Sequence, residues 1–197
     1  MPAGAPTDHN ARHPAVLALH GRGSDEADLR TLPMTEAPIH PETTIGHVHL
    51  KVSDLERAVQ FYTEVMGFEV TTRYGDSAAF LSAGGYHHHL GLNTWESRGG
   101  GAPAPGATGL YHFAILLPSR LELARTFKRI VDHGWPIGGA SDHGVSEAIY
   151  LDDPDGNGIE IYRDRPRAEW PREPNGDLRM GLAPLDFDGL LSELETA

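Results

Sequence analysis

Residues 46–52 read GHVHLKV, and this stretch begins the pattern that decides the fold. Its apolar residues alternate strictly with polar ones, which is typical of a β-strand with one buried face. The two histidines of the stretch, His47 and His49, therefore belong to the face opposite the core. The sequence predicts a strand here whose outward face carries imidazoles.

A helix is predicted directly after this strand. Ser53 is followed three residues later by Glu56, and this capping box predicts a helix N-terminus. Gly67 is expected to end the helix as its C-terminal cap. The apolar stripe between them has helical spacing and consists of Leu55, Ala58, Val59, Tyr62 and Val65. Three short strands are expected next, at about 68–74, 78–83 and 87–93.

The same order of elements is predicted a second time. Residues 111–117 (YHFAILL) read as a strand, Ser119 and Glu122 form a second capping box, and Gly134 ends the second helix. Strands are expected near 135–140, 146–152 and 158–163. An internal repeat of this kind fixes the architecture more firmly than any single motif. We therefore expect an α+β fold made of two βαβββ units, whose curved mixed sheets enclose one metal-binding cavity.

The repeat also sets the expected domain boundaries. Unit one covers about 44–94, a linker rich in Gly, Pro and Ala covers 95–109, and unit two covers about 110–165. Residues 1–43 show no sustained periodicity and are expected to form a flexible arm. The tail, 166–197, contains several prolines and then a predicted short helix near 186–194.

Composition excludes several classes of function. The chain has 197 residues and a net charge of −12, which argues against a nucleic-acid or anionic-membrane partner, since both need a basic surface. No apolar run approaches the length of a membrane span. The chain has no cysteine, so disulfides and zinc–thiolate sites cannot form. We expect a cytoplasmic protein that acts on a small molecule.

Alignment of the two units places four side chains at matching positions. His47 and His112 begin the first strands of their units, and Glu160 lies between two isoleucines that should face the helix. His89 holds the place in unit one that Glu160 holds in unit two. Two imidazoles and one carboxylate form the facial set of ligands that binds ferrous iron with open positions, and manganese, zinc or nickel also suit such ligands. We therefore predict that His47, His112 and Glu160 bind a divalent metal.

The role of His89 stays open at this point. It belongs to the stretch YHHHLGLN, residues 86–93, in which Leu90 and Leu92 should face the helix. Strict alternation then directs His87 and His89 toward the cavity and His88 toward the helix side. His89 is consistent with a fourth metal ligand, with an acid–base residue that faces the substrate, or with a packed side chain.

Several long segments resemble the vicinal oxygen chelate superfamily, which includes glyoxalases, bleomycin-resistance proteins and extradiol dioxygenases. Within it, they are similar to the catechol 2,3-dioxygenase group. The phrase DDPDGNGIEIY (152–162) is typical of the superfamily, and YHHHLGLNTW (86–95) and SDHGVSEAIY (141–150) resemble the subgroup more specifically. The other matching segments are IGHVHLKVSDLERAVQFYTEVMGFEV (45–70), GLYHFAILLPSR (109–120) and PLDFDGLL (184–191).

The resemblance implies an iron-dependent dioxygenase that opens the ring of a catechol-like substrate with dioxygen. It also implies that His47, His112 and Glu160 are the ligands, because these positions match the extradiol ligand positions. Tyr150 lies ten residues before Glu160, as an extradiol tyrosine does, and His143 is the nearest candidate for a histidine that contacts substrate or oxygen. With His89, these two form the predicted catalytic set.

Two alternatives remain beside the dioxygenase. One is a glyoxalase-like lyase, isomerase or thiol transferase, although His89 stands where glyoxalases carry a glutamate ligand. The other is a small-molecule binding protein of the resistance type. A homodimer is expected, and the cavity closes either within one chain or by exchange of units between two copies.

Overall fold

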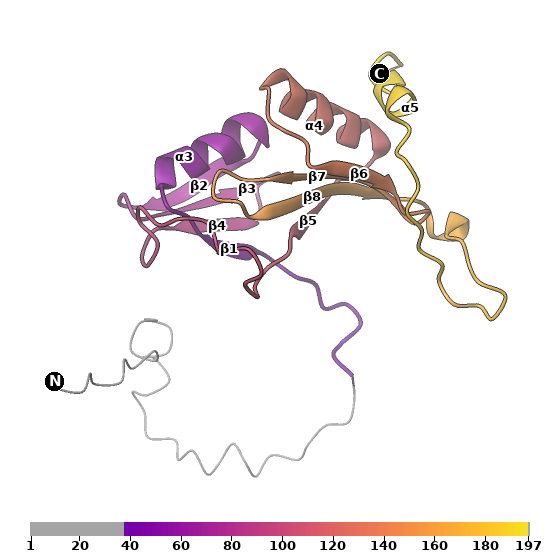
Figure 1. Ribbon diagram of the computed structural model, residues 1–197, viewed down its shortest axis with the longest axis horizontal. Coiled ribbons are helices and arrows are strands. Elements are labelled where there is room, and N and C mark those ends of the chain that lie inside the picture. Colours follow the sequence, from indigo (N-terminus) through magenta and orange to yellow (C-terminus); the bar gives the residue numbers. More distant parts are fainter. Residues whose placement is uncertain (1–37, 197) are drawn as a thin grey trace, which may run out of the picture. The chain divides into compact units, whose positions relative to one another are not determined.

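The computed structural model describes residues 38–196 (Figure 1). Residues 45–196 belong to one compact unit, which is distinct from residues 1–44. The flexible arm predicted for residues 1–43 lies almost entirely outside the described residues. Among the described residues, no helix is long and apolar enough to cross a membrane.

The first βαβββ unit forms a four-stranded mixed sheet. Its strands lie in the order β1-β4-β3-β2, with β1 and β4 parallel and the other neighbours antiparallel. Helix α3 packs against β3 and β4, and it continues directly into a π-helical turn that the sequence pattern did not predict. The elements are β1 (Val48–Lys51), α3 (Leu55–Gln60), η2 (Phe61–Val65), β2 (Glu69–Tyr74), β3 (Ala78–Ser82) and β4 (Leu90–Asn93).

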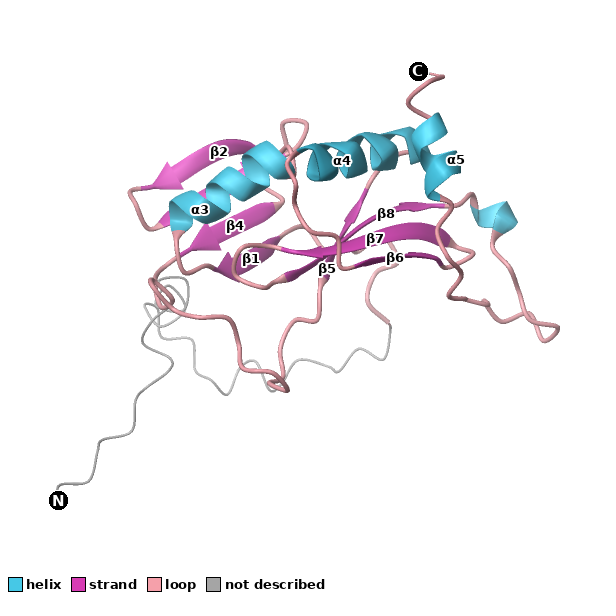
Figure 2. Ribbon diagram, turned by 45° about the horizontal axis from the view of Figure 1, so that its top comes forward, coloured by secondary structure: helices cyan, strands magenta, loops and turns pink. Residues whose placement is uncertain are grey.

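The second unit repeats this topology. Its strands lie in the order β5-β8-β7-β6, again with one parallel pair, β5 and β8, and with α4 packed against the sheet (Figure 2). Equal strand order and equal pairing confirm the predicted repeat and the α+β fold. The elements are β5 (Phe113–Leu116), α4 (Arg120–Asp132), β6 (Gly139–Asp142), β7 (Ser146–Asp152) and β8 (Gly158–Asp164).

The helix starts follow the prediction in one unit and depart from it in the other. Ser119 caps α4, since its side chain accepts a hydrogen bond from the backbone N–H of Glu122 at 3.2 Å. In the first unit the predicted cap at Ser53 is wrong, and Asp54 caps α3 instead. The Ser53 hydroxyl donates to Asp155 of the second unit, so a contact between the units replaces a local cap.

Two strand predictions also differ from the structure. Strand β6 begins at Gly139 rather than near residue 135, because Trp135 packs its ring against Phe61 of the first unit, with 4.6 Å between ring centroids. Strand β4 begins only at Leu90, so the three histidines before it are not in the strand. The helix ends were predicted correctly, since Gly67 and Gly134 both have the positive φ of a C-terminal cap.

A buried hydrogen bond joins the two units. Tyr62 is fully buried in the first unit, and its hydroxyl donates to Asp153 of the second unit at 2.9 Å. Burial and the nearby Asp153 raise the pKa of Tyr62 well above its ordinary value of 10.0, so the phenol stays protonated. Around this contact, buried apolar residues of both units form one continuous core. The aspartates of the DDPDGN motif therefore help to hold the units together.

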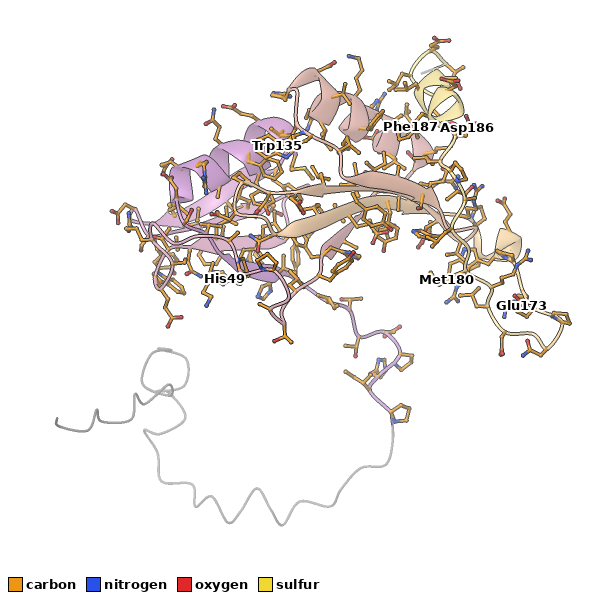
Figure 3. All side chains as sticks on the ribbon, in the orientation of Figure 1. His49, Trp135, Glu173, Met180, Asp186 and Phe187 are labelled. Carbon is orange, nitrogen blue, oxygen red and sulfur yellow. The ribbon has the colours of Figure 1, made fainter. Side chains whose placement is uncertain are left out.

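The tail returns along the second unit after β8. It contains a short 3-10 helix, η3 (Arg167–Glu169), and then helix α5 (Phe187–Ser192), which packs against α4 (Figure 3). The rings of Phe187 and Phe127 lie 5.1 Å apart, and Leu190 is fully buried. A short helix near 186–194 was expected, and here it anchors the end of the described chain.

Candidate metal centre

His112 and Glu160 lie together on the face of the second sheet that points away from the core. Glu160 is held by β8 between two fully buried isoleucines, and His112 directly precedes the neighbouring strand β5. The Nε2 atom of His112 is 3.0 Å from the Oε2 atom of Glu160, and the carboxylate side chain is only 14% exposed. A carboxylate in such a position needs a partner of positive charge.

This pair fits a divalent metal ion. Two ligand atoms at neighbouring positions of an octahedral ion, each about 2.1 Å from the ion, lie about 3 Å apart. The nitrogen and oxygen of His112 and Glu160 already have that separation. An imidazole and a carboxylate are also two members of the facial set that binds ferrous iron.

Tyr150 adds a hydroxyl group to this pair. It lies on β7 directly opposite Glu160 in the antiparallel register, and its hydroxyl oxygen lies 3.2 Å from Oε1 of Glu160, one of two acceptors within its reach. Burial, and then the charge of Glu160, raise the pKa of Tyr150 to about 12. The phenol is therefore protonated at neutral pH and can donate one hydrogen bond while accepting others.

His143 completes the cluster, although its spacing in the sequence was a weak guide. It follows β6, and its Nε2 atom is 2.8 Å from the Tyr150 hydroxyl. Its Nδ1 atom is 2.9 Å from the backbone oxygen of Gly181 in the tail. The tail contact could not be predicted from sequence, since nothing in residues 166–185 indicated pairing with the sheet.

A pocket of about 420 Å³ adjoins these residues. Within the part of the chain that the structure describes, its walls come from the second unit and from Leu182 of the tail, and no residue of the first unit lines it. The lining residues that matter here are His112, His143 and Tyr150, and the others are Tyr111, Gly138, Ser141, Leu151, Asp152, Gly158, Ile159 and Leu182. Among the described residues, the first unit therefore contributes no wall to this pocket.

His47 lies in a separate cluster of histidines on the first unit. The ring centroids of His47 and His88 lie 4.5 Å apart, and those of His88 and Phe80 lie 5.0 Å apart. The Nδ1 atom of His88 is also 2.7 Å from Nδ1 of His87. The prediction that His88 faces the helix is wrong, because β4 and its alternation of side chains begin only at Leu90. Burial and the neighbouring His47 lower the pKa of His49, and burial followed by its histidine neighbours lowers the pKa of His88, which favours neutral imidazoles.

His89 is engaged locally. Its Nδ1 atom accepts from the backbone N–H of Ala83 at 3.3 Å and lies 3.1 Å from the hydroxyl of Ser82. An accepting Nδ1 places the ring proton on Nε2. The structure thus gives His89 a role in holding the β3–β4 turn, and it does not bring His89 to Glu160.

Of the six predicted site residues, the structure gathers four and leaves two apart. His112, Glu160, Tyr150 and His143 form one cluster, joined by the close contact of His112 with Glu160 and by the hydrogen-bonding contacts of Tyr150. Within residues 38–196, no three His, Asp or Glu side chains are close enough together to hold a metal ion. The predicted third ligand, His47, therefore does not join the other two within this conformation of one chain.

Curated relatives of the chain include proteins that are named as dioxygenases. The chain is 48% identical over 155 residues to a catechol-2,3-dioxygenase of Bacillus subtilis, covering 79% of this chain and 53% of that protein. It is 30% identical to biphenyl-2,3-diol 1,2-dioxygenase 3 of Rhodococcus globerulus, covering 61% of this chain and 63% of that protein. The chain thus spans less than two thirds of the length of both relatives.

Solved structures and a family model agree on the fold. A glyoxalase/dioxygenase from Nostoc punctiforme superposes with a TM-score of 0.54 at 20% identity, covering 68% of this chain and all of that one. The model of the Glyoxalase/Bleomycin resistance protein/Dioxygenase superfamily matches residues 44–161, which cover unit one and all of unit two except its last few residues. The chain therefore belongs to the Glyoxalase/Bleomycin resistance protein/Dioxygenase superfamily.

Proposed function

We propose that this protein is an iron-dependent dioxygenase that opens the ring of a catechol-like aromatic substrate. The observation that carries the proposal is the cluster of a histidine–carboxylate pair with a hydrogen-bonded tyrosine and histidine beside one pocket. Relatives named as catechol and biphenyl-diol dioxygenases support the choice of substrate class.

Each residue of the cluster has a definite task in this proposal. His112 and Glu160 would hold the metal, with His47 as the third ligand. When bound, ferrous iron would supply open coordination positions and the redox chemistry with which such sites use dioxygen. Tyr150, protonated at neutral pH, orients a substrate hydroxyl by hydrogen bonding. His143 is within reach to take a proton through Tyr150, because its Nε2 atom lies 2.8 Å from the Tyr150 hydroxyl.

The function is tested by loading the protein with ferrous iron without oxygen and then adding oxygen and a panel of catechols. We expect a yellow ring-opened product and one dioxygen consumed for each catechol. Protein loaded with zinc is the matched control and should give no product. If iron binds at one equivalent per chain and every catechol is recovered unchanged, the dioxygenase proposal is wrong. Conversion without oxygen would favour a lyase or isomerase.

The proposal also includes a homodimer in which His47 of one copy completes the site of the other. The pocket lacks a wall from the first unit of its own chain, as described above. Strands β1 and β5 are edge strands, which are open to pairing. Next to them, Ile45 and Tyr111 have 90% and 91% of their surface exposed, an apolar surface that a second copy would cover.

Two inactive variants can test this exchange. Chains with His47→Ala and chains with His112→Ala should each lack ring-cleavage activity. After mixing and exchange of subunits, a mixed dimer has one site with both histidines intact, so about one quarter of the wild-type activity is expected if subunits pair at random. Absence of recovery, with mixed dimers verified by mass spectrometry, would show that each site is built within one chain.

A further inference from the structure

A segment of the tail runs along the second sheet beside the site. This segment, residues 180–185, is called the C-terminal strap below. Asp142 and Ala183 exchange two backbone hydrogen bonds, at 2.8 and 2.9 Å, and the N–H of Gly181 donates to the oxygen of His143 at 3.0 Å. The strap therefore pairs in antiparallel fashion with the outer edge of β6.

The strap fixes which nitrogen of His143 carries the proton. A backbone carbonyl can only accept a hydrogen bond, so the 2.9 Å contact with Gly181 places the proton of the neutral ring on Nδ1. The Nε2 atom is then a bare acceptor, 2.8 Å from the hydroxyl of Tyr150. In metal sites, a partner of this kind on the second nitrogen is what sets the tautomer and ring orientation of a histidine.

The state of His143 decides where Tyr150 directs its hydroxyl hydrogen. Tyr150 has one such hydrogen and two acceptors within reach, Nε2 of His143 at 2.8 Å and Oε1 of Glu160 at 3.2 Å. A bare Nε2 attracts the hydrogen away from the carboxylate. The oxygen of Tyr150 is then free to accept a hydrogen bond from a substrate hydroxyl. The carboxylate oxygens of Glu160 keep their lone pairs for the metal.

We propose that the C-terminal strap is a positioning element of the catalytic site, which acts through the Gly181 carbonyl on His143 and through His143 on Tyr150. The effect of this positioning on a bound substrate rests on the proposed function, whereas the tautomer of His143 does not depend on that function. Leu182 of the strap, 83% exposed, also lines the pocket and so contributes to the surface that selects the substrate.

The strap is held in place at its far end. Leu185 is buried, and Asp186 caps α5 through the N–H of Gly189 at 2.9 Å. Arg120 of α4 donates to the Gly189 oxygen at 2.7 Å. This anchoring makes the strap a fixed part of the sheet edge, as a positioning role requires.

The test compares Ala183→Pro with Ala183→Gly. Proline removes the N–H that donates to Asp142 and should release the strap, whereas glycine keeps this N–H and loses only an exposed methyl group. The readout is the two-bond ¹H–¹⁵N spectrum of metal-free protein labelled in histidine, at about pH 8, above the ordinary histidine pKa of about 6.5. His143 is assigned by the signal lost in His143→Gln.

We expect wild type and Ala183→Gly to show His143 protonated at Nδ1, and Ala183→Pro to show a shift toward protonation at Nε2. In the iron-loaded enzyme, kcat/KM should fall by about 10–100-fold in Ala183→Pro and stay within about twofold in Ala183→Gly. If His143 of the wild type is protonated at Nε2, the proposal is wrong, even if the proline variant does not fold. The proposal is also wrong if Ala183→Pro folds and its His143 gives the same nitrogen spectrum as wild type. If wild type cleaves no catechol, the proposed function fails while the nitrogen spectra still decide the role of the strap.

Discussion

Glu160→Gln is expected to release the metal and to lower kcat/KM by more than about a thousandfold. The carboxylate is the only anionic member of the predicted ligand set, and it is 14% exposed beside His112. Glutamine keeps the size of the side chain and removes its charge, so a divalent cation loses the group that balances it. A catalytic metal supplies several kcal/mol, and each 1.4 kcal/mol is a factor of about ten in rate. Metal content and the initial rate of ring cleavage measure the effect.

Glu169→Gln is the matched control for this substitution. Glu169 lies exposed in η3, and it makes no side-chain hydrogen bond or ion pair among those of the described residues. Its variant should keep one metal per site and a wild-type rate. If Glu160→Gln kept stoichiometric iron and a rate within about tenfold of wild type, Glu160 would not be a ligand, and the proposed centre would have to lie elsewhere.

Sequence reasoning succeeded where the information was local. The alternation around Leu50 and the apolar stripe of the first helix required no knowledge of distant residues, and every residue of that stripe is buried. The repeat then predicted the same succession of elements in both units. Glu160 was placed on the open face because two isoleucines flank it, and this prediction depends on the pleat of the strand, which the sequence determines directly. Tyr150 was predicted from the resemblance to extradiol dioxygenases, and the strand register places it opposite Glu160.

The errors arise where tertiary contacts replaced local ones. Ser53 bonds to Asp155 across the two units instead of capping its helix. The side chains of the three histidines before β4 do not alternate between the faces of the sheet, because the strand starts only at Leu90. The separation of His47 from His112 and the pairing of Gly181 with His143 depend on how whole units and the tail dock. The spacing of residues along the sequence does not indicate how the units and the tail dock.

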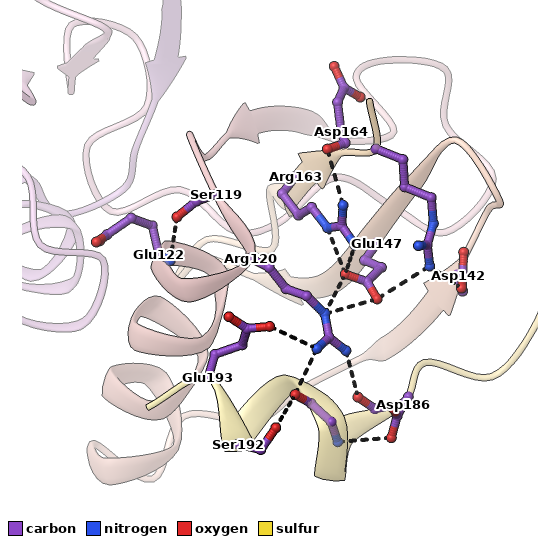
Figure 4. A network of polar contacts seen from close by, with 12 residues as sticks. Ser119, Arg120, Glu122, Asp142, Glu147, Arg163, Asp164, Asp186, Ser192 and Glu193 are labelled. Carbon is purple, nitrogen blue, oxygen red and sulfur yellow. Dashed lines mark hydrogen bonds and ion pairs between the residues drawn. The ribbon is translucent and has the colours of Figure 1, made fainter. Parts of the chain in front are cut away.

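The second large effect is expected on stability, from Glu147→Gln. Glu147 lies on β7 with its side chain 4% exposed, and its carboxylate accepts from Arg163 at 2.7 Å and from Arg120 at 3.0 Å (Figure 4). Arg165 approaches the other carboxylate oxygen at 3.5 Å. Removing one partner of a buried ion pair leaves the remaining charges without compensation. We expect the free energy of unfolding to fall by about 3 kcal/mol, as measured by urea denaturation.

Glu122→Gln separates this network from an ordinary surface pair. Glu122 pairs with Arg125 at 2.6 Å on an exposed face of α4, and its loss should change the free energy of unfolding by less than about 0.5 kcal/mol.

Arg120 also bonds to Glu193 and to the Gly189 oxygen of α5, so Glu147→Gln should loosen the tail before it unfolds the sheet. Amide hydrogen exchange should then rise first in α5. If both variants lost equally little stability, the arginines would be adequately solvated without Glu147, and the tail would be held by its apolar contacts with α4.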